Sequence, residues 1–481
     1  MFRRPLSFVI LGICLGAFAP LSLRAVETTG TIEGMVADPT GAVVPGVKVT
    51  LTNEGTGEVK VYPTDQLGRF VFPNLPVGTY ALRAEKEGFK TFVQTKTPVR
   101  VSEHLNLTVQ LELGAVATEV EVRASVTTVD TKSAALGNVI ENRAVVDLPL
   151  NGRNFLQLAT LVAGSTPAIG YSLPANPETP GGITSSPQVN GLRAESNNYL
   201  LDGADNNEPF LGSAAVVPSA EAIQEFKVET NLYNAEFGSS AGAIVNVVTK
   251  SGTNDFHGSV YEFFRNDALD ARNFFSPEVP VLKRNQFGFS VGGPIVRGRT
   301  FFFGNYEGFR QRSAETRTAS VPTLLERQGN FSQSAVQPID PLTGLPFPGG
   351  IIPLARFHPI SVNLLPFYPE PNVGDDRVVS SPAVPSNNDQ VLVRVDHKLR
   401  ENDNLTVRYF FQDGDGSFEF VPSFLGAIDV PGFPAGDKFR FHNVVISNTH
   451  TFSPTTILQS HFSYNRADLV AAAAQFQFDA Q

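Results

Sequence analysis

From residue 256 onward, hydrophobic and polar positions alternate in segments separated by polar or Gly- and Pro-rich connections. In segment 405–412, one face is apolar throughout, from Leu405 to Phe411. A period of two is typical of β-strands whose two faces meet different surroundings. The pattern predicts seven strands, over residues 256–265, 286–292, 301–310, 391–399, 405–412, 439–451 and 456–466.

The connections between these segments alternate in length, at about 20, 8, 78, 5, 26 and 4 residues. Transmembrane β-barrels join their strands by short periplasmic turns and long extracellular loops, whereas a soluble sandwich has no reason for such alternation. The apolar face of each strand would meet lipid, and the polar face would line the lumen. We therefore predict that residues 253–481 form the first seven or so strands of an antiparallel transmembrane β-barrel.

Residues 27–113 contain shorter alternating segments with regular turn signals, which predict a β-sandwich of six or seven strands. Four stretches of this region match the sequence pattern of a known domain family: 34–38, 45–47, 64–70 and 75–80. They resemble a carboxypeptidase regulatory-like domain. The resemblance implies a structural or docking module without catalysis, and His104 is the only histidine in these residues.

A linker is predicted at 114–126, and it contains a short alternating segment: Thr118, Glu119, Val120, Glu121, Val122, Arg123 and Ala124. One interpretation is a further edge strand. The other is a docking strand that pairs with the sheet edge of a partner through main-chain hydrogen bonds. The segment is similar to the TonB box of outer-membrane receptors, which implies that these seven residues contact TonB.

Residues 127–252 mix several kinds of element. We expect a short helix and turn over 140–155, a Gly-, Pro- and Ser-rich loop over 163–187, and strands near 189–193, 198–203, 223–229 and 242–252. Four stretches resemble the plug domain of Oar-like TonB-dependent receptors: Leu148–Asn154, Asn198–Gly203, Tyr233–Gly238 and Val248–Asn254. The predicted fold is thus mainly β: an N-terminal β-sandwich, an α+β plug domain and an incomplete transmembrane β-barrel.

The N-terminus has the pattern of a signal peptide over residues 1–25, with Arg3 and Arg4 before the apolar run Leu6–Phe18. A short membrane anchor is the alternative, but the run is shorter than the ~20 residues that span a bilayer. Cys14, the only cysteine, lies in this run. A processed chain would therefore lack disulfides, which suits a protein exported to the bacterial outer membrane.

The composition of the chain argues against a nucleic-acid-binding protein and against a helical membrane protein. The net charge is −10 and no Lys/Arg-rich tract is present, so nucleic acid is not an expected partner. No apolar run after the N-terminus is long enough for a helical membrane bundle. The 38 phenylalanines, 41 glycines and 35 prolines suit β-structure with long loops. The longest connection contains the aromatic residues Phe347, Phe357, Phe367 and Tyr368. They could contact a ligand, but we expect them by default to pack within the loop.

No catalytic constellation emerges, so we expect neither an enzyme nor a cofactor. The sequence contains no phosphate-binding loop and no nucleophile elbow. None of the seven histidines has the spacing of metal ligands: His104, His257, His358, His397, His442, His450 and His461. Asp413–Ser417 weakly resembles a calcium loop, but Phe424 stands where the twelfth-position Glu would be. We expect a surface turn there instead.

Together the resemblances imply a TonB-dependent outer-membrane receptor for a large or scarce ligand, with TonB, outer-membrane lipid and an unknown extracellular ligand as partners. Carbohydrate binding is one property this suggests. The alternative is a surface adhesin or assembly protein on the same barrel. Seven strands occupy about 226 residues, and plugged transporters close at about 22 strands, so we expect the chain to be a truncated receptor.

Overall fold

The computed structural model describes residues 28–114, 119–123, 135–167, 187–208, 212–234, 237–238, 240–272, 274, 279–314, 316–418 and 435–473. The predicted signal peptide, most of the predicted 163–187 loop, and Thr118 and Ala124 of the TonB-box-like segment lie outside these residues. Within them, no helix has the length and apolar character needed to cross a membrane.

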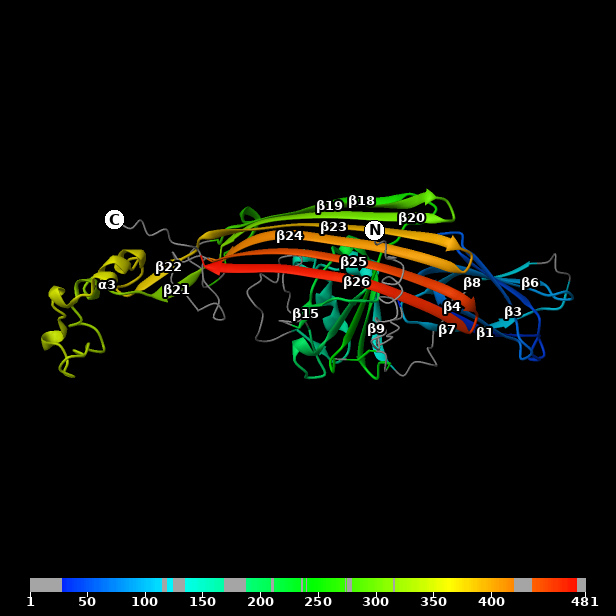
Figure 1. The fold of residues 1–481 in the computed structure, drawn as a ribbon, viewed down its shortest axis with the longest axis horizontal. Coiled ribbons are helices and arrows are strands. Elements are labelled where there is room, and N and C mark those ends of the chain that lie inside the picture. Colours follow the sequence, from blue (N-terminus) through cyan, green and yellow to red (C-terminus); the bar gives the residue numbers. More distant parts are fainter. Residues whose placement is uncertain are drawn as a thin grey trace, which may run out of the picture.

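Strands β1 to β8 form two packed sheets, which we call the sandwich (Figure 1). One sheet has the order β4-β1-β7 and the other the order β3-β2-β5-β6-β8. Their inward positions, such as Val49, Leu51 and Phe72, are fully buried, as the alternation predicts. The strands are β1 (Gly30–Ala37), β2 (Lys48–Asn53), β3 (Val59–Pro63), β4 (Arg69–Leu75), β5 (Gly78–Glu85), β6 (Thr91–Val99), β7 (His104–Gln110) and β8 (Glu119–Arg123).

The described residues between 135 and 249 form a central module around a five-stranded sheet of order β13-β12-β17-β16-β9. Phe155 and Phe226 meet in its core with ring centroids 5.1 Å apart. Its sheet strands are β9 (Leu136–Glu141), β12 (Asn198–Leu201), β13 (Ala204–Asp205), β16 (Ile223–Asn231) and β17 (Ile244–Thr249).

The helix expected over 140–155 is only partly right. Ile140 belongs to β9, where it pairs with Phe226 of β16. Helix α2 (Asn142–Asp147) follows, and the next residue, Leu148, has an extended backbone. A following proline disfavours helical geometry, and Pro149 stands at that position.

Seven long strands form one antiparallel sheet in chain order, which confirms all seven predicted strands. They are β18 (His257–Asn266), β19 (Leu282–Val296), β20 (Thr300–Ala314), β23 (Ala383–Arg400), β24 (Asp403–Phe418), β25 (Ala435–Ser453) and β26 (Thr456–Ala473). Long and short connections alternate as predicted, and the barrel is not closed. We call this sheet the long-strand sheet.

The turn expected at Asp413–Ser417 is wrong, because these residues lie inside β24. Gly414 is opposite Phe439 of β25, and a Cβ on Gly414 would come within 2.2 Å of the Phe439 ring. Glycine therefore lets this aromatic ring lie across the neighbouring strand instead of marking a turn.

The two faces of the long-strand sheet differ in polarity. One carries exposed apolar residues, such as Val407 and Phe462. The other buries polar side chains, among them Arg408 and Gln412, against the central module. Figure 1 shows the long strands passing over the central module, with the sandwich toward one end of the strands and the β20–β23 connection extending from the other. This connection holds β21 (Arg317–Ser320), α3 (Pro359–Leu364) and β22 (Arg377–Ser380).

Candidate functional site

The most deeply buried charges lie where the central module meets the long-strand sheet. Asp202 follows β12 and accepts hydrogen bonds from the backbone N–H and the hydroxyl of Thr249, both at 2.9 Å. From the long strands, Arg408 Nε lies 2.7 Å from Asp202 Oδ2 and Arg394 Nη1 lies 3.3 Å from Oδ1. Arg408 is fully buried. One carboxylate thus joins two segments about 200 residues apart in the chain.

Charge balance in this cluster is completed by Asp396, whose carboxylate lies 2.9 Å from Arg394 and accepts a 2.7 Å hydrogen bond from Thr406. Two arginines therefore face two aspartates. Buried ion pairs contribute little net stability, yet removing one partner is costly because it leaves a buried charge uncompensated. We call Asp202, Arg394, Asp396 and Arg408 the interface charge cluster.

A second group of polar contacts joins the module to β18, β19 and β20. Arg153 pairs with Glu221, and its guanidinium lies 3.9 Å from the centre of the Phe263 ring. Arg284 donates to Asn151 over 3.1 Å. Arg153 and Asn151 both belong to the plug-like stretch Leu148–Asn154, so that stretch faces the long-strand sheet.

The stretch Val248–Asn254 carries the chain from the module into the first long strand. Gly252 lies against the strands so closely that a Cβ would stand 2.4 Å from Phe302 O and 2.6 Å from Gly293 O. Asn254 then joins three parts of the molecule. Its N–H donates to Gly55 O over 2.9 Å and its amide donates to Thr56 O over 2.6 Å. Its side-chain oxygen accepts from the N–H of Gly298, in the turn between β19 and β20, over 2.8 Å.

The sandwich also contacts the sheet of the central module directly. The Val101 N–H donates to Glu225 over 2.5 Å, Lys227 donates to Ser102 O over 3.0 Å, and Arg100 pairs with Glu141. Burial raises the pKa of Glu225 to about 7, against the opposing effects of the Val101 N–H and of Arg100. These contacts hold the sandwich beside the module.

Docking of the sandwich is therefore expected to weaken as the pH rises. Docked Glu225 keeps its proton up to about pH 7, whereas a released Glu225 ionises near its ordinary pKa, so stability falls between about pH 4.5 and 7. The loss amounts to about 3 kcal/mol. Glu225→Gln should remove this dependence, whereas exposed Asp147→Asn should not. Denaturation midpoints from circular dichroism at pH 5 and 8 measure this loss of stability. An equal change of midpoint between the two pH values in wild type and Glu225→Gln would contradict the prediction.

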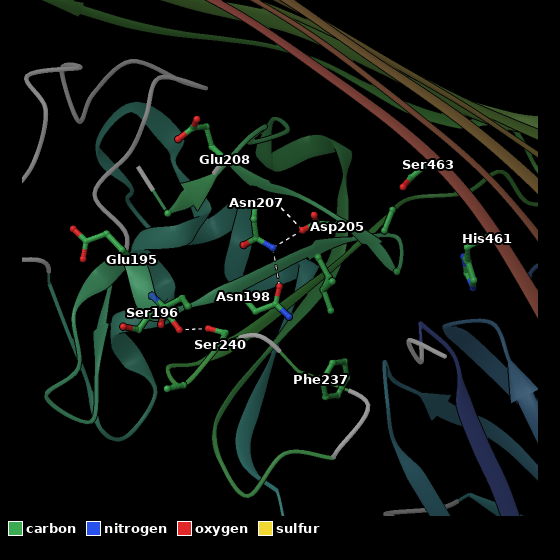
Figure 2. Close-up of a pocket in the computed structure, with 16 residues that line it drawn as sticks. Glu195, Ser196, Asn198, Asp205, Asn207, Glu208, Phe237, Ser240, His461 and Ser463 are labelled. Atoms are coloured by element: carbon green, nitrogen blue, oxygen red, sulfur yellow. Dashed lines mark hydrogen bonds between the residues drawn. The ribbon is translucent and has the colours of Figure 1, made fainter. Parts of the chain in front are cut away.

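A cavity of about 840 Å³ lies between the central module and β26. Figure 2 shows polar groups around it, including Asn198 and Asn207, which share a 2.8 Å hydrogen bond, and His461 and Ser463 from the strand. Three carboxylates, those of Glu195, Asp205 and Glu208, also line it. Amides and hydroxyls can bind polar groups, whereas the carboxylates disfavour anions.

The structure places the predicted TonB-contacting segment, as far as it is described, in β8 at the edge of the sandwich. The candidate histidines do not gather. His442 of β25 stacks on Tyr409 and His450 lies 3.5 Å from Asp403. Among the described residues, no cluster of three or more metal-ligating side chains is present. Of the loop aromatics, Phe347 lies under the Arg356 guanidinium at 5.6 Å.

Sequence reasoning did not single out the interface charge cluster or the Glu225 contact. One signal was available for the arginines: Arg394 and Arg408 occupy the polar positions of strands whose alternate positions are apolar. An arginine on the inner face of a barrel strand requires a buried or aqueous partner. Nothing in the sequence identifies Asp202 as that partner.

Comparison with known proteins gives two family matches: an outer membrane beta barrel domain over residues 248–481 and a carboxypeptidase regulatory-like domain over residues 31–112. The TonB-dependent transporter Oar of Myxococcus xanthus is 29% identical over 337 residues, which are 66% of this chain and 30% of that protein. The probable TonB-dependent siderophore receptor PirA of Acinetobacter baumannii is 31% identical over 144 residues, 29% of this chain and 18% of that protein. The chain thus spans less than a third of the length of either relative.

Two solved structures align with this chain over about 70% of its length. The transporter YddB from Escherichia coli aligns with a TM-score of 0.43 and 9% identity, over 69% of this chain and 38% of that one. A mutant of the ferric enterobactin receptor PfeA from Pseudomonas aeruginosa aligns with a TM-score of 0.42 and 11% identity, over 70% of this chain and 42% of that one.

Proposed function

Since this chain is a homologue of the TonB-dependent transporter Oar, with a carboxypeptidase regulatory-like domain and an outer-membrane β-barrel domain, we propose that the full-length protein is a TonB-energised outer-membrane transporter. The protein is located in the outer membrane. In this proposal the central module is the plug, the long-strand sheet is part of the barrel wall, and a large or scarce ligand is taken up past the plug.

The observation that carries the proposal is the interface charge cluster. Asp202 of the plug is held by Arg394 and Arg408 of the wall, which keeps the plug under the strands in one position. A plug that closes a lumen must be held firmly enough to block it, yet must be released by a pulling force. Buried ion pairs suit this role because they specify position while adding little net stability.

The proposal assigns TonB contact to Thr118–Ala124. These residues alternate and precede the plug, so a strand of TonB could pair with them and transmit force to the module that follows. The adhesin alternative has no support from the relatives, whose names describe a TonB-dependent transporter and a TonB-dependent receptor. The barrel would receive its ligand through the long connections, of which 315–382 is the largest described.

Deleting Thr118–Ala124 from the full-length protein is expected to abolish binding of the purified periplasmic domain of TonB, measured by titration calorimetry. The matched control is Glu119→Gln with Glu121→Gln, which keeps the main chain. Because pairing of this kind depends mainly on main-chain hydrogen bonds, the control should retain most of the affinity. Unchanged TonB binding by the deletion variant would refute the assigned segment.

A further inference from the structure

Strand β8 is held by the sandwich as a member of its larger sheet. It lies parallel to β6, in a register that runs from Thr91 opposite Glu119 to Thr95 opposite Arg123. Parallel neighbours need a crossover connection, and β7 makes it here by passing through the opposite sheet, beside β1. The TonB-box-like segment is therefore built into the fold of the sandwich.

Contacts just before β8 set where this pairing begins. The Lys90 N–H donates to Glu112 O over 2.8 Å, and the side chains of the same two residues form a 3.0 Å ion pair. The Gly114 N–H donates to Gly88 O over 3.2 Å. The chain entering β8 is thus tied to the residues that enter β6, so the two strands start side by side.

The far end of the pairing is set by a bend in β6. Lys96 has a positive φ of 56°, and its N–H donates to the Glu54 carboxylate over 2.9 Å. A residue in this conformation interrupts the regular strand ladder. The surface that β6 offers to β8 therefore covers Thr91–Thr95, which matches the five residues of β8.

The other edge of β8 carries no strand in the described part of the chain, where β8 pairs with β6 alone. In a strand paired on one side, the remaining N–H and C=O groups point outward and form a template for an added strand. The template is already extended, so a partner strand does not have to order β8 when it binds.

We propose that the sandwich presents β8 as a preformed sheet edge, and that TonB adds its strand to the outer side of β8 while β8 stays on β6. This inference rests on the proposed function, because it takes TonB as the partner of the segment. It makes the sandwich part of the TonB docking surface. Asn254 and the Glu225 contact hold the sandwich on the plug, so the edge has a defined place beside it.

A cross-link between β6 and β8 tests this in the full-length protein. Val93→Cys and Glu121→Cys place thiols at paired positions of the two strands. The oxidised protein is expected to bind the purified periplasmic domain of TonB within about threefold of the reduced protein. A loss of about tenfold or more on oxidation, reversed by reductant, would overturn the proposal, because β8 would then have to leave β6 to bind. Failure of the cross-link to form would also overturn it.

Hydrogen exchange on the unmodified protein gives a second measurement. Among Thr91–Thr95, the amides that point toward β8 should stay protected when TonB binds, whereas release of β8 would expose them; the amides that point toward β5 stay protected in either case. Deletion of Thr118–Ala124 separates this inference from the proposed function. If the deletion abolishes TonB binding and the cross-link does too, the segment is the TonB site but the presented edge is wrong. If the deletion has no effect, the assignment of TonB to the segment fails.

Discussion

Asp202→Asn is expected to weaken the attachment of the central module to the long-strand sheet by about 3–5 kcal/mol. The substitution preserves shape but removes the carboxylate that faces Arg408 and Arg394. Arg408 is fully buried, so its charge would remain in a site of low polarity, with Arg394 and Asp396 as its remaining charged neighbours in the cluster. The cost arises from that uncompensated charge rather than from the lost attraction.

A buried thiol can report this change. Ala222 is fully buried in the central module, so Ala222→Cys would supply a single buried thiol in a background in which all other cysteines are replaced by serine. Maleimide labelling of the full-length protein across a guanidinium series measures the free energy of opening. Asp147→Asn, on the exposed face of α2, is the matched control and should leave labelling unchanged.

The double variant Asp202→Asn with Arg408→Met makes the electrostatic explanation falsifiable. Methionine removes the stranded charge and keeps much of the volume, so the double variant should be more stable than Asp202→Asn alone. If both variants label at the same denaturant concentration, the cost comes from packing, and the charge explanation is wrong.

Gly252→Ala is expected to destabilise the junction between the central module and the long-strand sheet by about 1–3 kcal/mol. The added Cβ would meet the backbone oxygens of Phe302 and Gly293 at 2.4 and 2.6 Å, and backbone in a paired strand cannot move aside as a flexible side chain can. The central module would have to shift away from the long-strand sheet, which would strain the Asn254 contacts as well.

The same thiol assay measures this effect, with Gly304→Ala as control. Gly304 lies in β20, and a Cβ there would have its nearest neighbour at 4.0 Å, so alanine should be accommodated. Equal labelling of the Gly252 and Gly304 variants would show that the close approach at Gly252 does not restrain the central module.

Much of the fold was predictable from local pattern. The period of two located all seven long strands, because the faces of each strand meet different surroundings and the side chains must follow. The four plug-like stretches were recognisable too, and several of their residues hold the interface: Asn151, Arg153, Asp202, Thr249, Gly252 and Asn254. The contact that each of these residues makes is known only from the tertiary structure.

The predictions of secondary structure failed at two places where the local sequence pattern did not reveal the strand pairing. The end of strand β9 was expected to be helical. Local pattern could not show that it is a strand, because its pairing with β16 joins residues about 85 positions apart. Asp413–Ser417 was expected to turn because glycine and aspartate favour turns, yet pairing of β24 with both neighbours overrides that local preference.

By itself, the sequence determined the order of the modules, the strands of the long-strand sheet and which face of each strand is apolar, because these follow from side chains a few residues apart. Only the tertiary structure decided that Asp202 meets Arg394 and Arg408, that Glu225 is buried under the sandwich, and that β8 pairs with β6. Such contacts join residues distant in the chain. Their energies depend on burial and on the charges brought beside them, and neither quantity exists until the chain has folded.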